Sequence, residues 1–471
     1  MHESCGVFGI YAPDEDVARL TFFALFALQH RGQESAGIAS ADGHNLQVYA
    51  QMGLVSQVFT EESLGKLTGH IAIGHNRYST TGSSRVCNAQ PLIVGVGPES
   101  LALAHNGNIV NSKLLYQELV DKGYSFASTT DSEVIGNLII SVPGEMVSRI
   151  RHAMHRLQGA YSLTMMTKDR LFAARDPLGI RPLCLGTINT HGWVVASETC
   201  ALDHIGATFV REIEPGEIVS IGPDGLESYR EPSPQHAMCI FEYIYFARLD
   251  STMNGRLLYQ ARQAMGAGLA DEHPVDADLV VGVPDSAIAA ATGYAQRSGI
   301  PLAEGLIKNR YVGRTFIEPD QRLRDLGAKM KYNPMAQLLK GKRIVMVDDS
   351  IVRATTTPHL VRLLRKAGAK EVHVRIVAPP IRYPCFFGID MATRWELIAF
   401  QKTVPEVRDV IGADSLGYLS IKGLIKAVAL PREGFCLACF NGEYPIPVQM
   451  DMEKLSLETM PHQDPATVET K

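Results

Sequence analysis

The 471-residue sequence has no apolar run that approaches the roughly 20 residues needed to cross a bilayer. Its N-terminus carries His2 and Glu3 in place of a basic and then apolar segment, so no secretory signal is predicted. An excess of positive charge is also missing, because 45 Lys and Arg face 50 Asp and Glu, for a formal charge of -5. We therefore expect a cytoplasmic protein without a nucleic-acid or membrane partner, in which anionic ligands are held locally.

Internal repeats and long low-complexity runs are absent from the sequence as well, and 46% hydrophobic with 20% charged residues is ordinary for a globular chain. The chain is too long for one ordinary core, so we predict two α/β domains. It has only eight cysteines. In a reducing compartment cysteines are core residues, metal ligands or nucleophiles. The sequence around each cysteine has to indicate which of these roles it has.

The first predicted domain spans residues 5–230 and contains short apolar runs bounded by Gly, Asn and Ser. Such runs predict the strands of a layered α/β sandwich, here at 5–11, 71–75 and 101–105. Apolar residues at helical spacing predict a helix over 17–30. A polar segment with two prolines, 230–236, is typical of an interdomain linker.

The second predicted domain spans 231–450 and alternates strand and helix patterns, which indicates a parallel sheet. Thr357 and Pro358 suit the N-cap and first position of its best-defined helix. Strands are predicted at 279–284, 343–347 and 371–377. We expect the polar stretch at 451–471 to be a mobile tail.

Cys5 opens the first predicted strand, and an isolated cysteine there is more often a buried strand thiol than a nucleophile. Four motifs change that interpretation because they follow it in order. They are QHRGQESAG at 29–37, GHNRY at 74–78, HNGN at 105–108 and TDSE at 130–133. The set resembles the N-terminal-nucleophile glutaminase domain of class II amidotransferases, which implies an αββα sandwich.

This resemblance implies that Cys5 begins the mature chain and attacks the glutamine amide, with its own α-amine as base. An α-amine titrates at about 7.7 to 8 and a thiol at about 8.5, so the two exchange a proton near neutrality. Asn106 and the backbone amide of Gly107 would form the oxyanion hole. Residues 1–4 would be a cleaved propeptide, since His2 is too large for simple methionine trimming.

Two charged residues in these motifs suit the two ends of an amino acid. Arg77 can clamp the glutamine α-carboxylate with a bidentate contact, and Asp131 can pair with the α-ammonium. Taken singly, each could equally be a structural ion pair or a helix cap. Their order within the glutaminase motifs favours the binding role.

Residues 343–357, RIVMVDDSIVRATTT, combine an apolar strand, two acids and a small-residue loop that opens a helix. Strand carboxyl ends and helix N-termini are where α/β proteins bind phosphate. The segment resembles the signature of type I phosphoribosyltransferases, although a solvated acidic pair is the plain alternative. The resemblance implies that Asp348 and Asp349 hold ribose hydroxyls and Mg²⁺. The 5-phosphate would be taken by the loop residues Ser350, Arg353, Ala354, Thr355 and Thr356.

Ala354 departs from that signature, which has glycine at this position. If the backbone there needs a positive φ, the methyl group costs about 1 kcal/mol. We therefore expect weaker phosphate binding at a site that is otherwise intact.

Two further loops complete the predicted acceptor site. The segment 282–286, GVPDS, resembles the pyrophosphate loop, with Asp285 on the ligand and Ser286 helping the acids to hold Mg²⁺. The segment 308–316 resembles the flexible loop that closes over pyrophosphate, through Lys308, Arg310 and Tyr311. A solvated basic loop is the alternative for that segment.

Cys436 and Cys439 form a Cys-x-x-Cys pair, which alone suits zinc, an iron-sulfur centre or a redox disulfide. Cys239 and Cys385 stand in aromatic settings that resemble the iron-sulfur branch of the amidophosphoribosyltransferase family. The resemblance implies a 4Fe-4S cluster on these cysteines, with zinc as the alternative. The remaining cysteines are expected to be packing residues: Cys87, Cys184 and Cys200.

Resemblance to this family covers residues 5 to about 447. It implies a reaction in which glutamine, phosphoribosyl pyrophosphate and water give phosphoribosylamine, glutamate and pyrophosphate, the first committed step of purine synthesis. The resemblance also implies that the protein is a homo-oligomer, either a dimer or a tetramer. It further implies inhibition by purine nucleotides. Two rival hypotheses, another class II amidotransferase and a phosphoribosyl-pyrophosphate-sensing regulator, each account for only one half of the motifs.

Overall fold

The computed structural model describes residues 5–78, 82–231, 233, 235–309, 331–389, 391, 394–448 and 457–458. The predicted propeptide at 1–4 lies outside the described residues, as do Arg310 and Tyr311. Among the described residues, no helix is both long enough and apolar enough to cross a membrane.

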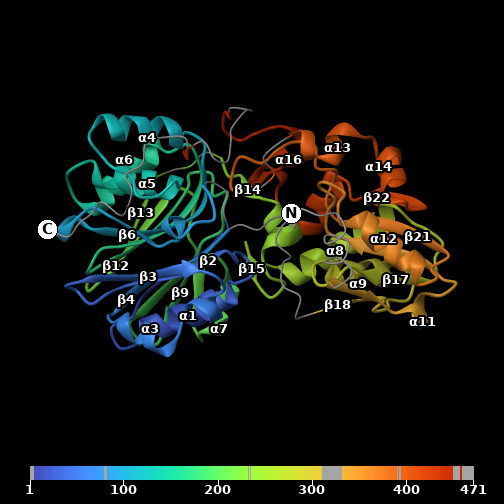
Figure 1. Ribbon diagram of the computed structural model, residues 1–471, viewed down its shortest axis with the longest axis horizontal. Coiled ribbons are helices and arrows are strands. Elements are labelled where there is room, and N and C mark those ends of the chain that lie inside the picture. Colours follow the sequence, from blue (N-terminus) through green and yellow to red (C-terminus); the bar gives the residue numbers. More distant parts are fainter. Residues whose placement is uncertain are drawn as a thin grey trace.

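The first domain is a four-layer αββα sandwich, seen edge-on in Figure 1. One sheet has the order β11-β9-β10-β1-β4-β2-β3. Its strands are β1 (Gly6–Tyr11), β2 (Ser35–Ala41), β3 (Leu46–Met52), β4 (Ile71–Arg77), β9 (Cys184–Ile188), β10 (Gly192–Ala196) and β11 (Thr208–Glu212). Its outer face carries α1 (Val17–Ala27), α2 (Val55–Val58), α3 (Glu61–Lys66) and α7 (Thr199–His204).

The facing sheet has the order β13-β12-β8-β7-β6-β5. Its strands are β5 (Leu92–Val94), β6 (Leu101–Ile109), β7 (Gly159–Met166), β8 (Leu171–Arg175), β12 (Glu217–Gly222) and β13 (Gly225–Arg230). The helices α4 (Ser112–Asp121), α5 (Asp131–Ile140) and α6 (Met146–Arg156) cover its outer side (Figure 1).

Alternation along the strands divides their side chains between two cores. On β1, Val7 lies in the core between the sheets, whereas Phe8 lies in the core beneath α1. On β6, Ala104 lies between the sheets and Leu103 under the outer helices. Because successive strand residues point to opposite faces, this parity determines which side chains reach the space between the sheets.

The second domain contains a parallel sheet in the order β17-β20-β21-β22. The strands are β17 (Leu279–Gly282), β20 (Arg343–Asp348), β21 (Glu371–Ile376) and β22 (Ser415–Tyr418). The helices packed around it include α8 (Leu258–Glu272), α9 (Ile288–Ser298), α12 (Thr357–Lys366), α14 (Val404–Ile411) and α15 (Ile421–Val428). Parallel pairing with helical crossovers confirms the predicted phosphoribosyltransferase-type fold.

Short elements complete this domain at its edges. They are β14 (Met238–Cys239), β15 (Thr252–Met253), β16 (Arg256–Leu257), β18 (Leu306–Lys308), β19 (Tyr332–Pro334), β23 (Phe435–Cys436), α11 (Ala336–Leu339), α13 (Ile398–Gln401) and α16 (Ala438–Asn441). Several expected boundaries are shifted: α1 ends at Ala27, before the expected residue 30, and β17 ends at Gly282, before the expected 284. The helix α12 begins at Thr357, with Thr356 as its N-cap. Pro358 still falls in the first turn, where its missing N–H costs no hydrogen bond.

The two domains meet through buried polar contacts. Asn108 Nδ2 donates to the backbone oxygen of Phe386 at 2.8 Å, and Arg181 Nη2 donates to that of Phe387 at 2.7 Å. The side chains of Arg181 and Glu242 are both fully buried where they meet across this junction. These contacts hold the glutaminase sandwich directly against the second domain.

Candidate active sites

Three predicted glutaminase residues lie on or directly before strands of the two facing sheets. Cys5 directly precedes β1, Arg77 ends β4 and Asn106 lies on β6. Residues two or four positions away along the chain, Val7, Ile73 and Ala104, fill the core between the sheets. Because side chains alternate along a strand, Cys5, Arg77 and Asn106 point to the same side as these residues. The sandwich therefore directs the thiol, the guanidinium and the amide into one enclosed space.

The Cys5 thiol is buried, with 6% of the residue exposed. Its Sγ donates to the Tyr78 backbone oxygen at 3.3 Å and lies 3.4 Å from the Tyr78 backbone nitrogen, which donates to it. Burial raises the pKa of Cys5 to about 11, although the Tyr78 hydrogen bond and the nearby Arg77 act to lower it. The thiol thus needs a base close by to become a nucleophile at neutral pH.

Asn106 is fully buried, and neither its Nδ2 nor its Oδ1 has a hydrogen-bond partner among the described residues. An unpaired buried amide costs roughly 1–3 kcal/mol, which a ligand oxygen at this position would recover. Gly107 follows with φ +151°, and a Cβ there would lie 1.9 Å from the Ala160 backbone oxygen. Only glycine fits, and the arrangement suits the predicted oxyanion hole.

Arg77 and Asp131 make some structural contacts of their own. Arg77 Nη1 donates to the Ser83 backbone oxygen at 3.1 Å and lies 3.9 Å from Glu34. Asp131 opens α5, and its Oδ2 accepts from the Ile109 backbone nitrogen at 3.0 Å. Both residues are close enough to Cys5 to influence the pKa of its thiol. The structure therefore brings the predicted glutamine-reading charges to the nucleophile.

The predicted phosphoribosyl residues line a cavity of 920 Å³ at the carboxyl edge of the parallel sheet. Asp285, Ser286 and Lys308 contribute one part of its wall, and the loop from Asp348 to Thr356 contributes another. His30 and Gln33 of the glutaminase domain line it too. The acceptor cavity is therefore shared between the domains, a feature absent from the sequence-based expectation.

The acids at the end of β20 are tied together. Asp349 Oδ2 accepts from Ser286 Oγ at 2.6 Å, and its Oδ1 accepts from Ser350 Oγ at 2.5 Å. Asp348 accepts from the Asp349 backbone nitrogen at 2.9 Å. Burial and the neighbouring Asp349 carboxylate raise the pKa of Asp348 well above its ordinary value. Two adjoining carboxylates with a hydroxyl form the oxygen set that Mg²⁺ accepts.

Two cations at the rim of this cavity are paired with acids. Lys308 Nζ contacts Asp285 Oδ2 at 2.5 Å, and Arg353 Nε contacts Glu396 Oε2 at 2.8 Å. The expected ligand-binding role of Arg353 therefore requires exchange of this partner for phosphate.

Ala354 has φ +50°, so the departure from glycine falls at a position with left-handed backbone. A positive φ at this position is the condition under which we expected weaker phosphate binding. The side chain of Ala354 also lines the cavity. A methyl group is thus held in a backbone conformation that favours glycine.

The predicted cluster cysteines converge at the domain junction. Cys239 and Cys436 are paired residues of the parallel strands β14 and β23, and Cys439 follows on α16. Burial raises the pKa of Cys239 to about 12, and Arg181 and Cys385 also influence it. Among the described residues, no group of three or more His, Cys, Asp or Glu side chains is spaced to hold a metal ion.

The other cysteines differ from one another. Cys184 and Cys200 are buried in the core beneath α1 and α7, as expected for packing residues. Cys87 is only partly buried, and it lies near enough to Arg77 to influence the pKa of that guanidinium. The packing role expected for Cys87 stays a prediction.

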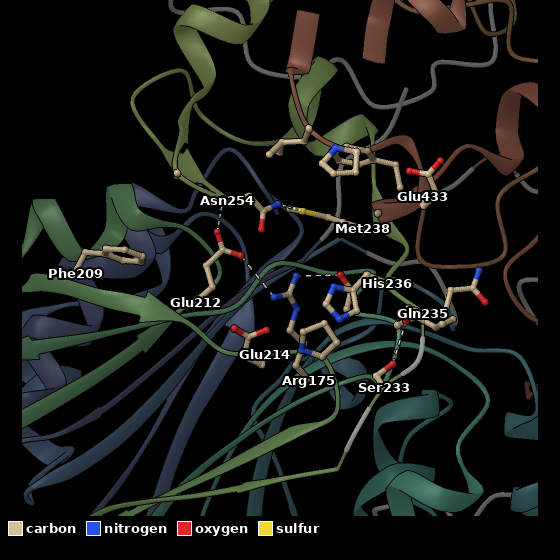
Figure 2. Close-up of a pocket in the computed structure, with 18 residues that line it drawn as sticks. Arg175, Phe209, Glu212, Glu214, Ser233, Gln235, His236, Met238, Asn254 and Glu433 are labelled. Atoms are coloured by element: carbon tan, nitrogen blue, oxygen red, sulfur yellow. Dashed lines mark hydrogen bonds and ion pairs between the residues drawn. The ribbon is translucent and has the colours of Figure 1, made fainter. Parts of the chain in front are cut away.

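A second cavity, of 720 Å³, lies at the domain junction (Figure 2). In it Asn254 Nδ2 contacts Met238 Sδ at 3.1 Å, and Arg175 lies 3.7 Å from Glu212. Met238 and Phe435 of its wall directly precede Cys239 and Cys436. The described residues lining this cavity include none of the predicted catalytic groups.

Part of the C-terminal tail contacts the glutaminase domain. Leu457 is buried in the core under α4 to α6, and Glu458 Oε1 accepts from the Ser83 backbone nitrogen at 2.6 Å. The Ser83 backbone oxygen receives the bond from Arg77. At these two residues the tail is packed beside the glutamine site, in contrast to the mobile tail expected.

Comparison with known proteins matches residues 75–204 to the glutamine amidotransferase domain and residues 254–382 to the phosphoribosyl transferase domain. Amidophosphoribosyltransferase from Synechococcus elongatus is 53% identical over 467 residues, covering 97% of this chain and 95% of the relative. The chain belongs to the amidophosphoribosyltransferase family. Its function is therefore that of a glutamine-dependent phosphoribosyltransferase.

Other amidophosphoribosyltransferases agree in sequence and in structure. The one from Methanocaldococcus jannaschii is 49% identical, covering 95% of this chain and 98% of the relative. The solved glutamine phosphoribosylpyrophosphate amidotransferase of B. subtilis, complexed with ADP and GMP, is 47% identical and superposes with a TM-score of 0.90. That match covers 95% of this chain and 99% of the solved one. This chain and the solved relative share the two-domain α/β fold over nearly their whole length.

Several residues around these sites were missed by sequence reasoning. Tyr78, whose backbone holds the Cys5 thiol, stood within the GHNRY motif and could have been found there. Arg262 and Tyr332 line the phosphoribosyl cavity but belong to no motif. Glu242 also escaped, because its partners are distant in sequence.

Proposed function

We propose that Cys5 is the nucleophile that releases ammonia from glutamine, and that this ammonia displaces pyrophosphate from phosphoribosyl pyrophosphate in the second domain. One observation carries the proposal: Cys5, Arg77 and Asn106 share the strand parity of residues in the core between the sheets, and the Asn106 amide is buried without a partner among the described residues. A glutamine side chain would supply the missing oxygen.

In the first half-reaction, the thiol proton moves to the α-amine of Cys5 as Sγ attacks the amide carbon of glutamine. Asn106 Nδ2 and the Gly107 backbone nitrogen donate to the resulting oxyanion. The C–N bond then breaks, the amine returns the proton to departing ammonia, and water hydrolyses the thioester to glutamate. Arg77 and Asp131 hold the α-carboxylate and α-ammonium of glutamine during these steps.

In the second half-reaction, ammonia attacks the anomeric carbon of phosphoribosyl pyrophosphate, and pyrophosphate leaves with the bonding electrons. The backbone and hydroxyls of Ser350, Thr355 and Thr356 suit the 5-phosphate, at the N-terminus of α12. The pyrophosphate would be held by Asp285 and Lys308 and, outside the described residues, by Arg310 and Tyr311. The attacking nitrogen loses one proton to pyrophosphate or to solvent, which leaves neutral phosphoribosylamine nitrogen and free pyrophosphate.

Asp348, Asp349 and Ser286 would hold Mg²⁺. The fit rests on their geometry: Ser286 Oγ donates to Asp349 Oδ2 at 2.6 Å, and Asp348 adjoins Asp349 at the end of β20, so these oxygen donors lie together. When bound, the ion neutralises phosphate oxygens of the substrate. The chain itself orients the ion's ligands through the hydrogen bonds of Ser286 and Ser350 to Asp349.

Cys239, Cys385, Cys436 and Cys439 would hold the 4Fe-4S cluster. The fit rests on their proximity: Cys239 and Cys436 are paired on neighbouring strands, Cys439 follows three residues later, and the backbone nitrogen of Tyr383, two residues before Cys385, donates to the Cys439 backbone oxygen at 3.1 Å. Four thiolates can ligate either a 4Fe-4S cluster or a tetrahedral zinc ion, so zinc is the alternative. Iron and sulfide analysis of the purified protein, against zinc analysis, separates the two.

Regulation and assembly are extended from relatives. One solved relative is complexed with ADP and GMP, and another, 46% identical with a TM-score of 0.91, is described as the allosteric regulatory enzyme of purine biosynthesis. Inhibition of this enzyme by purine nucleotides follows as a proposal. A homo-oligomer, the cytoplasmic location and the predicted domain limits stay predictions.

Peptide mapping after reaction with an electrophilic glutamine analogue tests the proposed nucleophile. The label should reside on Cys5, in a peptide whose N-terminus is Cys5 itself, because residues 1–4 must be removed to free the amine. Excess glutamine should protect the thiol from labelling. A label on another residue, or active enzyme whose mass includes residues 1–4, would contradict the proposal.

A further inference from the structure

Glu242 is a second-domain carboxylate buried entirely between two arginines of the glutaminase domain. It begins the turn Glu242–Phe246, three residues after Cys239. Its Oε1 accepts from Arg31 Nη2 at 2.8 Å and from Arg181 Nη1 at 3.3 Å, and its Oε2 accepts from Arg31 Nη1 at 3.0 Å. The two-pronged contact with Arg31 fixes the guanidinium in one plane.

The same guanidinium holds the backbone of the nucleophile. Arg31 Nε donates to the Cys5 backbone oxygen at 3.0 Å, and Nη1 also donates to Glu198 at 2.5 Å. Although burial acts to lower it, the pKa of Arg31 is held above its ordinary value by Glu242 and Glu198. A charged, fully buried Arg31 thus connects the carbonyl of Cys5 to a carboxylate of the other domain.

The turn that begins at Glu242 also forms part of the phosphoribosyl cavity, through Tyr245, Phe246 and Ala247. Arg262 of α8 lines the cavity as well and donates to the Ala247 backbone oxygen at 2.6 Å. One short segment therefore contacts the acceptor cavity at its end and holds Arg31 at its start.

We infer that Glu242 is a positioning residue for glutamine hydrolysis, which holds Cys5 in its reactive orientation through Arg31. The inference rests on the proposed role of Cys5 as nucleophile. Without the Glu242 charge, Arg31 is drawn toward Glu198, and its hydrogen bond to the Cys5 carbonyl shifts. A shift of about 1 Å in a reacting group can cost about 100-fold in rate.

Glu242→Gln tests this inference because glutamine keeps the shape of the side chain and removes its charge. We expect the kcat of phosphoribosyl-pyrophosphate-dependent glutamate release to fall about 10- to 100-fold. The KM for glutamine should change less than about threefold, since Arg77 and Asp131 read the substrate. Synthesis of phosphoribosylamine from added ammonia should stay unchanged, because it bypasses Cys5.

Glu217→Gln is the matched control. Glu217 is buried in the glutaminase domain and is bound by Arg211 and Ser228 at 2.6 Å each. It offers the same loss of charge at a buried carboxylate, paired with a partly exposed arginine, in an ion pair that does not include Cys5. We expect lower thermal stability in this variant but an unchanged kcat for glutamate release.

Equal kcat values for Glu242→Gln and Glu217→Gln would overturn the inference, and so would a change confined to the KM for glutamine. If Glu242→Gln also lost ammonia-dependent synthesis, Arg31→Lys would decide, since it leaves the second domain unaltered. The same fall in kcat with intact ammonia-dependent synthesis supports the inference, and wild-type kcat contradicts it. Cys5→Ala measured alongside separates the premises: retained glutamate release there would refute the proposed function itself.

Discussion

The glutamine site lies between two packed sheets, whereas the phosphoribosyl site lies at the open carboxyl edge of one sheet. In the first, Cys5, Arg77, Asn106 and Asp131 are all buried. In the second, Arg353, Thr355 and Thr356 are exposed on a loop beside a 920 Å³ cavity. The difference matches the ligands: a small amino acid can be enclosed by side chains, but a multiply charged sugar phosphate needs backbone donors and room for a metal ion.

This contrast teaches that the two sites depend on their surroundings in different ways. The predicted glutamine site depends on strand parity and on an amide that has no hydrogen-bond partner among the described residues, so single side chains should have large and separable effects there. The predicted phosphoribosyl site uses a loop and a helix terminus, where many weak hydrogen-bond donors each contribute a small part of the binding free energy. The predictions below test that distinction, from the largest expected effect to the smallest.

Asn106→Ala removes the orphaned amide from the enclosed site. The kcat for glutamate release should fall about 100- to 1,000-fold with little change in the KM for glutamine, because the amide acts on the oxyanion. Steady-state kinetics with glutamine and with ammonia would check this. A rise in KM at constant kcat would assign Asn106 to ground-state binding and break the contrast between the sites.

Arg77→Lys keeps the charge and removes the planar fork that faces the α-carboxylate. We expect the KM for glutamine to rise about 10- to 100-fold, which corresponds to one charge-assisted hydrogen bond. The kcat should fall far less than in Asn106→Ala. If kcat fell strongly while the KM for glutamine stayed constant, Arg77 would not bind the α-carboxylate, and its contact with Ser83 would have a structural role.

The acid pair should make binding of phosphoribosyl pyrophosphate sensitive to pH. Burial and Asp349 raise the pKa of Asp348, so Asp348 gains its proton while the pH is still above about 4, where an ordinary aspartate stays ionised. At limiting magnesium, the KM for phosphoribosyl pyrophosphate should therefore rise as the pH falls, with ammonia as the nitrogen donor.

Asp349→Asn sharpens that test because it removes a charge that raises the pKa of Asp348. The midpoint of the rise in KM should move to lower pH. This shift is separate from any overall loss of affinity for phosphoribosyl pyrophosphate. A midpoint that stays in place would show that Asp348 is not the titrating group.

Ala354→Gly should have the smallest effect. Glycine tolerates the φ of +50° at this position, so the KM for phosphoribosyl pyrophosphate should fall about two- to fivefold, equivalent to about 0.4–1 kcal/mol. Glutamine hydrolysis by the enclosed site should not change. An increase in this KM would show that the methyl group contributes to the site.

Local sequence patterns predicted the fold and much of both sites. Residues 343–357 carry strand, acids, loop and helix start in one continuous segment, so their arrangement could be foreseen apart from the one-residue shift at the start of α12. Cys5 is predicted as the nucleophile because the motifs that follow it occur in a fixed order. In the first case the information lies within about one structural element, whereas in the second each motif is local but the set extends from residue 5 to residue 133.

Contacts across the domain junction could not be foreseen in the same way. Glu242 meets Arg31 across 211 residues of sequence, and Asn108 meets Phe386 across 278. Each is an ordinary polar residue until the fold buries it against its partner. Leu457 is similar, because its short apolar stretch gives no sign of the core it enters.

The central claim is that Cys5 removes nitrogen from glutamine for transfer at the second site. Phosphoribosylamine synthesis by Cys5→Ala, measured with glutamine and then with ammonia as the nitrogen donor, tests it most directly. The account predicts that the glutamine-dependent reaction disappears and that the ammonia-dependent reaction continues at the wild-type rate. Synthesis from glutamine that persists in this variant would contradict it.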